Sequence, residues 1–202
     1  MTLWRGPSPL ILASQSRARQ TLLANAGIEF EAVPADIDER AVQQSSGLAS
    51  PGAIAALLAR EKALMVSSQH SSRFVVGADQ TLALAARLFS KPAGRAEAAE
   101  QLRALADNRH ELHSAVAVAR DGKILFEAVS VAGMTMRRLS HAEIEAYLNE
   151  AGEAVTSSVG AYQLEGLGVH LFERIEGDHF TILGLPLLQL LAFLRSERLL
   201  AV

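Results

Sequence analysis

The sequence predicts an α/β protein built on a mixed sheet with flanking helices. Strand-like and helix-like patterns alternate along the 202 residues, which is typical of this class. Two hairpin-like segments, residues 81–89 and 111–136, break a purely parallel strand order. No repeat or composition shift marks a linker, so we expect one domain over residues 1–202, with two lobes around a cleft.

The composition excludes several kinds of protein. Half of the residues are hydrophobic and a fifth are charged, as in folded soluble proteins. A net charge of −3 provides no general basic field, so we expect no stable complex with nucleic acid. Without cysteine there are no disulfides, thiolate metal sites or cysteine nucleophile. No signal sequence or bilayer-length apolar run is recognised, so we expect a cytoplasmic protein without membrane contact.

The first predicted strand and helix form a candidate anion site. Residues 10–12 are an apolar run too short for a helix, and Ser16 can cap a helix that stops at Gly27. The N-terminus of such a helix presents free N–H groups and a partial positive charge above the sheet. Two hydroxyls and two cations gather there: Ser14, Ser16, Arg17 and Arg19. The pattern fits a phosphate site, and it also fits a capped helix with solvated arginines.

The next segments supply carboxylates and a lysine. Residues 28–33 alternate as a half-buried strand, and three carboxylates follow in a predicted loop at 36–39. They indicate either a solvated turn or oxygen ligands for a hard cation such as Mg²⁺. The pair Ser50-Pro51 predicts the start of a helix. Lys62 lies at the edge of its apolar stripe, where it either extends to solvent or projects into a cleft.

A second buried strand ends in a carboxylate. Residues 73–79 are mostly apolar up to Asp79, and ligands of open α/β sheets lie beyond the C-terminal ends of such strands. Asp79 is therefore a better functional candidate than an average surface aspartate. The hairpin or kinked strand at 81–89 then delivers Lys91.

The rest of the chain completes the α/β pattern. Its predicted elements are a helix at 94–107, strands at 111–120 and 123–136 joined by the turn Asp121-Gly122, a helix with a capping box at Ser140 and Glu143, and a helix opened by Pro186. We assign five leucines of the last helix to the core: Leu187, Leu188, Leu190, Leu191 and Leu194. Because Gly166-x-Gly168 lacks the third glycine of a dinucleotide site, we interpret it as strand-turn geometry.

No common catalytic motif is present. The sequence has no GxxxxGK[ST] loop, HExxH or GxSxG. His110 and His113 would point to opposite faces of a strand, so we do not expect one zinc ion to use both. Carboxylates and cations near element ends remain: Glu39, Asp79, Arg19, Lys62 and Lys91. This set suits polyphosphate chemistry, where a metal and lysines neutralise charge and a carboxylate orients or deprotonates water.

These residues lie in motifs that resemble the Maf family of nucleoside triphosphate pyrophosphatases. The motifs keep their order over nearly the whole chain, so the set is specific although each motif alone is weak. They are Leu12–Leu23, Ile37–Glu39, Ala59–Ala63, Gly77–Asp79, Lys91-Pro92, His110, Gly160–Tyr162, Glu165–Gly168, Ile175–Gly177 and Gly184–Leu187.

The resemblance implies an elongated mixed α/β structure with a deep central cleft, similar to the inosine triphosphatases. It also implies hydrolysis of standard or modified nucleoside triphosphates to monophosphate and pyrophosphate, with Mg²⁺ or Mn²⁺ as the cofactor. The implied roles are phosphate binding by Ser14 and Arg19, charge neutralisation by Lys62 and Lys91, and metal and water binding by Glu39 and Asp79. Asp79 matches the position of the proton acceptor.

Several positions depart from the family pattern. Ser16-Arg17-Ala18-Arg19 stands where Ser-Pro-Arg-Arg is common, and Gln80 follows Asp79 where threonine is usual. Ser157-Ser158 replaces an Asp-Lys pair, and Glu165, a candidate substrate-binding residue, replaces glutamine. These motifs are expected to line the cleft. The preferred base therefore stays open between dTTP and UTP on one side and a methylated guanosine triphosphate on the other.

Two functions stay open from the sequence. One is a pyrophosphatase that removes non-standard or excess nucleotides. The other is a nucleotide-binding regulator of cell division without significant catalysis. The intact set of Glu39, Lys62, Asp79 and Lys91 favours the enzyme. The expected partner is a nucleoside triphosphate, and a homodimer is left open.

Overall fold

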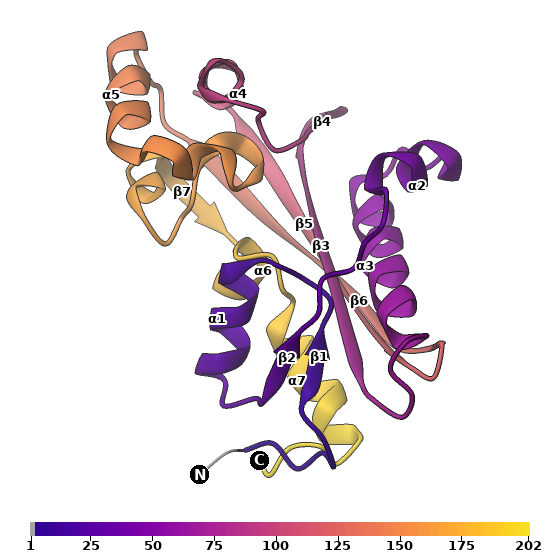
Figure 1. The fold of residues 1–202 in the computed structure, drawn as a ribbon. Coiled ribbons are helices and arrows are strands. Elements are labelled where there is room, and N and C mark those ends of the chain that lie inside the picture. The colour runs from indigo at the N-terminus through magenta and orange to yellow at the C-terminus, as the bar shows by residue number, and fades with distance from the viewer. Residues whose placement is uncertain (1–2) are drawn as a thin grey trace. The chain divides into compact units, whose positions relative to one another are not determined.

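The computed structural model describes residues 3–202, which form two compact units. The first unit takes the chain up to Gln80 together with residues 113–130 and 179–202, and the second takes residues 81–112 and 131–178. Seven strands form a mixed sheet in the order β2-β1-β3-β5-β6-β7, with β4 beside β3 (Figure 1). The predicted mixed α/β sheet is therefore confirmed. One domain over residues 1–202 and a cleft between two lobes stay predictions.

Three long strands have residues in both units: β3 (Val75–Leu84), β5 (Arg109–Arg120) and β6 (Lys123–Met136). The other elements of the first unit are β1 (Leu10–Leu12), α1 (Arg17–Asn25), β2 (Phe30–Ala32), α2 (Glu39–Ser46), α3 (Pro51–Ser67), α6 (His179–Ile182) and α7 (Leu187–Ser196). The other elements of the second unit are β4 (Arg87–Phe89), α4 (Arg95–Leu105), α5 (His141–Ala151), the 3₁₀ helices η1 (Gly152–Thr156), η2 (Val159–Ala161) and η3 (Leu167–Leu171), and β7 (Phe172–Glu176).

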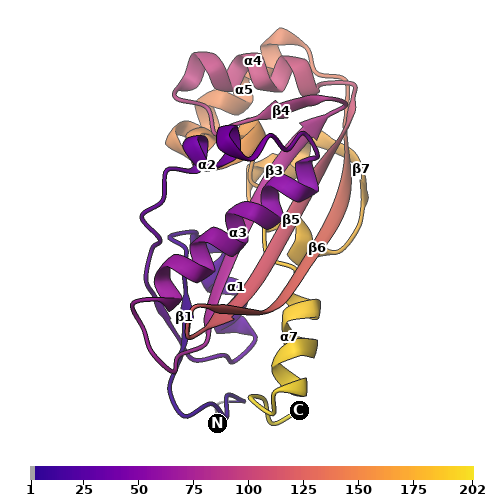
Figure 2. The same cartoon turned by 90° about the vertical axis from the view of Figure 1, so that its right-hand side faces the viewer.

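Helices cover both faces of the sheet in the first unit. β1 pairs in parallel with β2 and with β3. On one face the buried residues between α3 and β5 are all alanines, with partly buried Leu64 and Ile124 packed against them: Ala55, Ala59, Ala63, Ala115, Ala117 and Ala119. On the other face α1 and α7 pack their leucines on apolar residues of β1, β3 and β5. Figure 2 shows α3 running along β3 and β5. Alanine has little bulk, so α3 lies close to the sheet, and this closeness matters for the site.

In the second unit, short strands pair with the ends of long ones. β4 returns antiparallel to β3, with Leu82 opposite Phe89. β7 lies antiparallel to the last residues of β6, with Met134 opposite Ile175. Helix α4 contacts both α5 and η2. Among residues 3–202, no helix combines the length and the apolar content that crossing a bilayer would require.

Several local predictions are confirmed. Ser16 caps α1, the pair Ser50-Pro51 begins α3, and the capping box of α5 has both of its hydrogen bonds. Asp121 and Gly122 both have positive φ, as a tight hairpin turn needs.

Two predicted boundaries near the site are wrong. Asp79 does not end its strand, because β3 continues to Leu84 and these extra residues pair with β4. Glu39 was expected in a loop, but it begins α2. The reason is that the Asp38 side chain accepts a hydrogen bond from the N–H of Ala41 at 3.0 Å and so caps the helix.

Two predictions in the C-terminal half are also wrong. The Gly166-x-Gly168 segment is not a strand turn, because it opens η3; a Cβ at Gly168 would lie 2.4 Å from the carbonyl oxygen of Gln163. Leu188 was assigned to the core with the other leucines of α7, yet 53 % of its surface is exposed. It lies on the solvent side of the amphipathic helix, whereas Leu187 and Leu190 are buried.

Candidate active site

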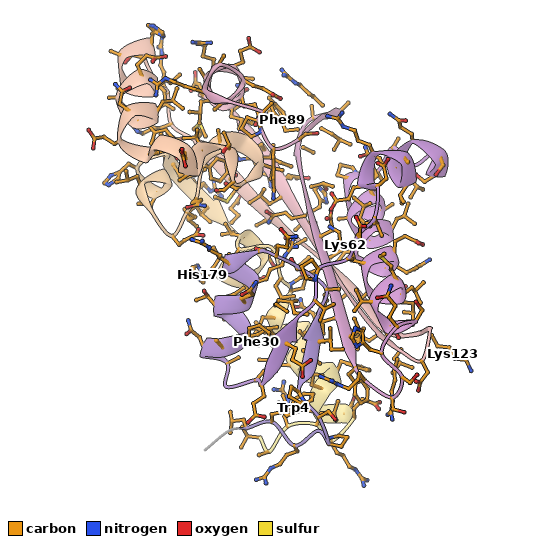
Figure 3. All side chains as sticks on the ribbon, in the orientation of Figure 1. Trp4, Phe30, Lys62, Phe89, Lys123 and His179 are labelled. Carbon is orange, nitrogen blue, oxygen red and sulfur yellow. The ribbon has the colours of Figure 1, made fainter. Side chains whose placement is uncertain are left out.

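A buried ion pair joins α3 to β3. Lys62 Nζ lies 2.6 Å from Asp79 Oδ1, and only 8 % and 7 % of the two residues are exposed. Figure 3 labels Lys62 where α3 passes β3. Gly77 permits this approach, because a Cβ there would lie 2.1 Å from the carbonyl oxygen of Ala59. A lysine at the edge of an apolar stripe usually extends to solvent. Here the carboxylate holds it inside.

A second carboxylate reaches the same ammonium. Glu39, the first residue of α2, places Oε1 2.7 Å from Lys62 Nζ. More than half of the Glu39 side chain is exposed, whereas Asp79 is enclosed. Lys62 therefore bridges a carboxylate open to solvent and a carboxylate held in the interior.

At the start of α1 the structure brings together Ser14, Ser16 and Arg19, three residues of the predicted anion site. Ser16 Oγ accepts the N–H of Arg19 at 3.4 Å, and Ser14 Oγ accepts the N–H of Ser16 at 3.2 Å. Arg19 Nη1 donates to Ser14 Oγ at 3.2 Å and to the carbonyl oxygen of Ala78 at 2.8 Å. Arg19 Nε donates to the carbonyl oxygen of Gly184 at 2.7 Å. The guanidinium is thus fixed to the residue that precedes Asp79, and none of these bonds uses Nη2.

Burial and charge act against each other at these groups. Burial raises the pKa of the Asp79 carboxyl, while the Lys62 and Arg19 cations oppose that rise. Burial also lowers the pKa of Arg19, while Asp79 and Glu39 oppose that fall. Arginine remains a cation in proteins. The result is a positive guanidinium beside a carboxylate that is more basic than an ordinary aspartate.

Glu39 and Asp79 are the predicted metal ligands. Within residues 3–202, no group of three or more His, Cys, Asp or Glu side chains is arranged to hold a metal ion by itself. The two carboxylates contact one ammonium and so lie close together. Mg²⁺ commonly uses one or two carboxylates and takes its other ligands from water and substrate phosphates. The pair fits that kind of site, and the metal role stays a prediction.

Two predicted site residues belong to the second unit. Lys91 is exposed in the loop after β4, and Glu165 is exposed in the turn before η3. Ser14, Arg19, Glu39, Lys62 and Asp79 all belong to the first unit, where the structure brings them together. The roles of Lys91 and Glu165 stay predictions.

The sequence reasoning missed a polar cluster beside Asp79. Gln80 Nε2 donates to Ser114 Oγ at 2.9 Å and to the carbonyl oxygens of Thr181 and Ile182 at 3.0 Å each. Gln80 was noted only as a departure from a family pattern. The available signal was a hydroxyl at Ser114, on a strand face that is otherwise apolar at Val116.

Comparisons with known proteins show the family of this chain. A family model described as Maf-like protein matches residues 9–197. A nucleoside triphosphate pyrophosphatase of Bradyrhizobium diazoefficiens is 73 % identical over 202 residues, which is all of both chains. A 7-methyl-GTP pyrophosphatase of Rhizobium etli is 52 % identical, covering 93 % of this chain and 95 % of its own. A solved dITP/XTP pyrophosphatase of Mycobacterium abscessus is 17 % identical, with 95 % of this chain and 96 % of that chain covered at a TM-score of 0.40.

Proposed function

Because the chain belongs to the Maf-like protein family, we propose that it hydrolyses a nucleoside triphosphate to the monophosphate and pyrophosphate. The observation that carries the proposal is the enclosed Asp79, which pairs with Lys62. Asp79 follows Ala78, whose carbonyl oxygen accepts a hydrogen bond from Arg19. A basic carboxylate beside fixed cations suits attack of water on a phosphate.

The start of α1 is the proposed phosphate site. Its free N–H groups and the Arg19 guanidinium supply positive charge, and three acceptors already fix the guanidinium. Ser14 Oγ accepts two hydrogen bonds, so its own proton remains for a phosphate oxygen. Lys62 would offset part of the remaining negative charge, and the same role for Lys91 stays a prediction.

Asp79 is the proposed general base. Its carboxylate takes a proton from water while the water oxygen bonds to the α-phosphorus. The bond from that phosphorus to the bridging oxygen breaks, and pyrophosphate leaves with the electron pair. Burial raises the pKa of Asp79, and the Lys62 cation opposes that rise and so favours the ionised carboxylate. Because the raised pKa belongs to the base, we expect activity to fall at acid pH as Asp79 becomes protonated.

A divalent metal is part of the proposal. Glu39 and Asp79 would hold Mg²⁺ or Mn²⁺, which would neutralise phosphate charge during the reaction. We also propose that the protein acts on the cytoplasmic nucleotide pool and removes non-standard or excess nucleotides. Nucleotide profiles of a deletion strain would test this role, because the substrate should accumulate.

One assay tests the proposed activity. The purified chain is given a nucleotide panel with Mg²⁺ or Mn²⁺, and the products are separated. The panel includes dTTP, UTP and 7-methyl-GTP, the last because one relative carries that name. We expect monophosphate and pyrophosphate. Diphosphate and orthophosphate would refute cleavage at the α–β bond, and tight binding without turnover would favour a regulator instead.

A further inference from the structure

The carbonyl oxygen of Thr181 is a meeting point of three donors. It accepts from Ser114 Oγ at 2.6 Å, from Gln80 Nε2 at 3.0 Å and from the backbone N–H of Gly184 at 3.1 Å. Gln80 Nε2 also reaches the next carbonyl, that of Ile182. Two side chains from β3 and β5 thus hold one short backbone segment, residues 181–184.

The cluster is unusual for an interior position. Ser114 and Thr181 are fully buried, and Val116 and Val118 beside Ser114 belong to the apolar core. A buried hydroxyl stabilises a protein less than an apolar side chain of similar size unless it is well bonded. Polar exceptions of this kind are expected mainly where they serve a site.

The held segment ends at the residue that fixes Arg19. The Gly184 carbonyl accepts from Arg19 Nε at 2.7 Å, and a Cβ at Gly184 would lie 3.2 Å from Arg19 Nη2. Gly184 has a φ of +88°, so the turn depends on glycine as well as on the carbonyls before it. A small shift of this turn changes the direction of the guanidinium.

We propose that Ser114 is a positioning residue for phosphate binding. Together with Gln80 it fixes residues 181–184, so that the Gly184 carbonyl orients the Arg19 guanidinium. This inference rests on the proposed function, in which Arg19 binds phosphate. Ser114 itself makes no contact with substrate in this arrangement.

The test compares two serine-to-alanine variants in the first unit. Ser114→Ala removes the proposed support, and Ser67→Ala is the control. Ser67 is also buried, at 1 % exposure, and its Oγ accepts the N–H of Gly122 at 3.1 Å, at the C-terminal end of α3. Ser114→Ala loses two hydrogen bonds, one donated to the Thr181 carbonyl and one accepted from Gln80, and Ser67→Ala loses one, so both variants should melt below the wild type. Only Ser114→Ala should raise KM for the best triphosphate, by up to about tenfold.

Combination with Arg19→Ala shows whether Ser114 acts through Arg19. In that background Ser114→Ala should raise KM no further, because the group that it positions is gone. An additive effect, or a Ser114→Ala variant with the KM of Ser67→Ala, would overturn the proposal. If Ser114→Ala does not fold, Gln80→Glu carries the same test, since a carboxylate cannot donate to the two carbonyls.

A measurement without substrate separates this inference from the proposed function. The Arg19 Nε–H signal, assigned by its loss in Arg19→Lys, reports the bond to Gly184 by NMR. It should exchange faster with solvent in Ser114→Ala and stay protected in Ser67→Ala. Equal protection refutes the positioning role. If the signal exchanges faster in Ser114→Ala but the wild-type protein hydrolyses no triphosphate, the support of Arg19 stands and the proposed reaction is refuted.

Discussion

The two units each bury an ionisable pair, and the pairs are built on opposite principles. In the first unit Lys62 forms ion pairs with both Asp79 and Glu39. In the second unit His110 is fully buried, and its Nε2 lies 2.7 Å from the Tyr162 hydroxyl oxygen. Within the described part of the chain, His110 Nδ1 has no hydrogen-bond partner. Burial lowers the pKa of His110 to about 4, so the ring is neutral.

We propose that the first pair serves chemistry and that the second pair serves packing. A perturbed pKa alone does not mark an active site, because structural groups are perturbed as well. The Lys62 pair combines burial with fixed charges beside a helix N-terminus. The His110 ring lies against the aromatic rings of Tyr162 and Phe172, which are uncharged. We therefore expect substitutions in the first pair to change turnover and those in the second to change stability.

Asp79→Asn should give the largest effect. It keeps the shape and loses the basicity, so kcat should fall by about 10²–10⁴-fold. Measuring the Mg²⁺ concentration for half-maximal rate separates two roles, because a lost base leaves it unchanged and a lost ligand raises it. Asp121→Asn, in the tight turn between β5 and β6, is the control, since asparagine also tolerates the positive φ of that position. A folded Asp79→Asn protein with most of its turnover would remove Asp79 from the mechanism.

Lys62→Met should cost about 3–5 kcal/mol of unfolding free energy at neutral pH, because Asp79 is left buried without its partner. Urea unfolding of Lys62→Met measures this loss. Arg60→Met, on the same helix, breaks an exposed pair with Glu127 and should cost less than about 1 kcal/mol. Equal losses in the two variants would mean that burial of the Lys62 pair does not matter for stability.

The His110 pair predicts a dependence of stability on pH. Unfolding returns the pKa of His110 from about 4 to about 6.5, so the unfolded chain binds a proton first as the pH falls. Stability is therefore complete above pH 6.5 and falls by about 3 kcal/mol by pH 4. Unfolding curves of the wild type and of His110→Phe across this window measure the effect. Parallel curves would show that His110 does not carry it.

Glu165→Gln should give the smallest effect. A carboxylate only accepts hydrogen bonds, whereas an amide also donates, so the relative kcat/KM among nucleotides should change by about 2–10-fold. Total turnover should change less than the ranking. Glu173→Gln, another exposed carboxylate of the second unit, is the control. An unchanged ranking in Glu165→Gln would count against a selective role.

Local signals predicted most of the fold around the site. The Ser16 cap, the Ser50-Pro51 start and the capping box of α5 depend on neighbours in sequence, and all three are confirmed. The end of β3 could not be found this way, because its last residues are extended by pairing with β4. The α2 helix was missed because its polar sequence has no apolar stripe, and capping by Asp38 was not counted.

The site was predicted as a list of residue types and not as an arrangement. Composition and position in the chain selected Arg19, Lys62 and Asp79, but not which of them touch. Contacts such as that between Arg19 and Gly184 join residues 165 positions apart and leave no local pattern. The Gln80 cluster was missed for the same reason, since its acceptors are backbone carbonyls that carry no side-chain signature.

The small residues between α3 and the sheet also limit which substitutions this protein can accept. Codons for alanine and glycine become codons for valine by a single base change. At Ala59, Ala63 or Gly77 such a change would push α3 away from β3, because the added carbons have no space. Lys62 would move with the helix and separate from Asp79. Natural variants in which Lys62 and Asp79 no longer pair can therefore arise while every polar residue of the site stays the same.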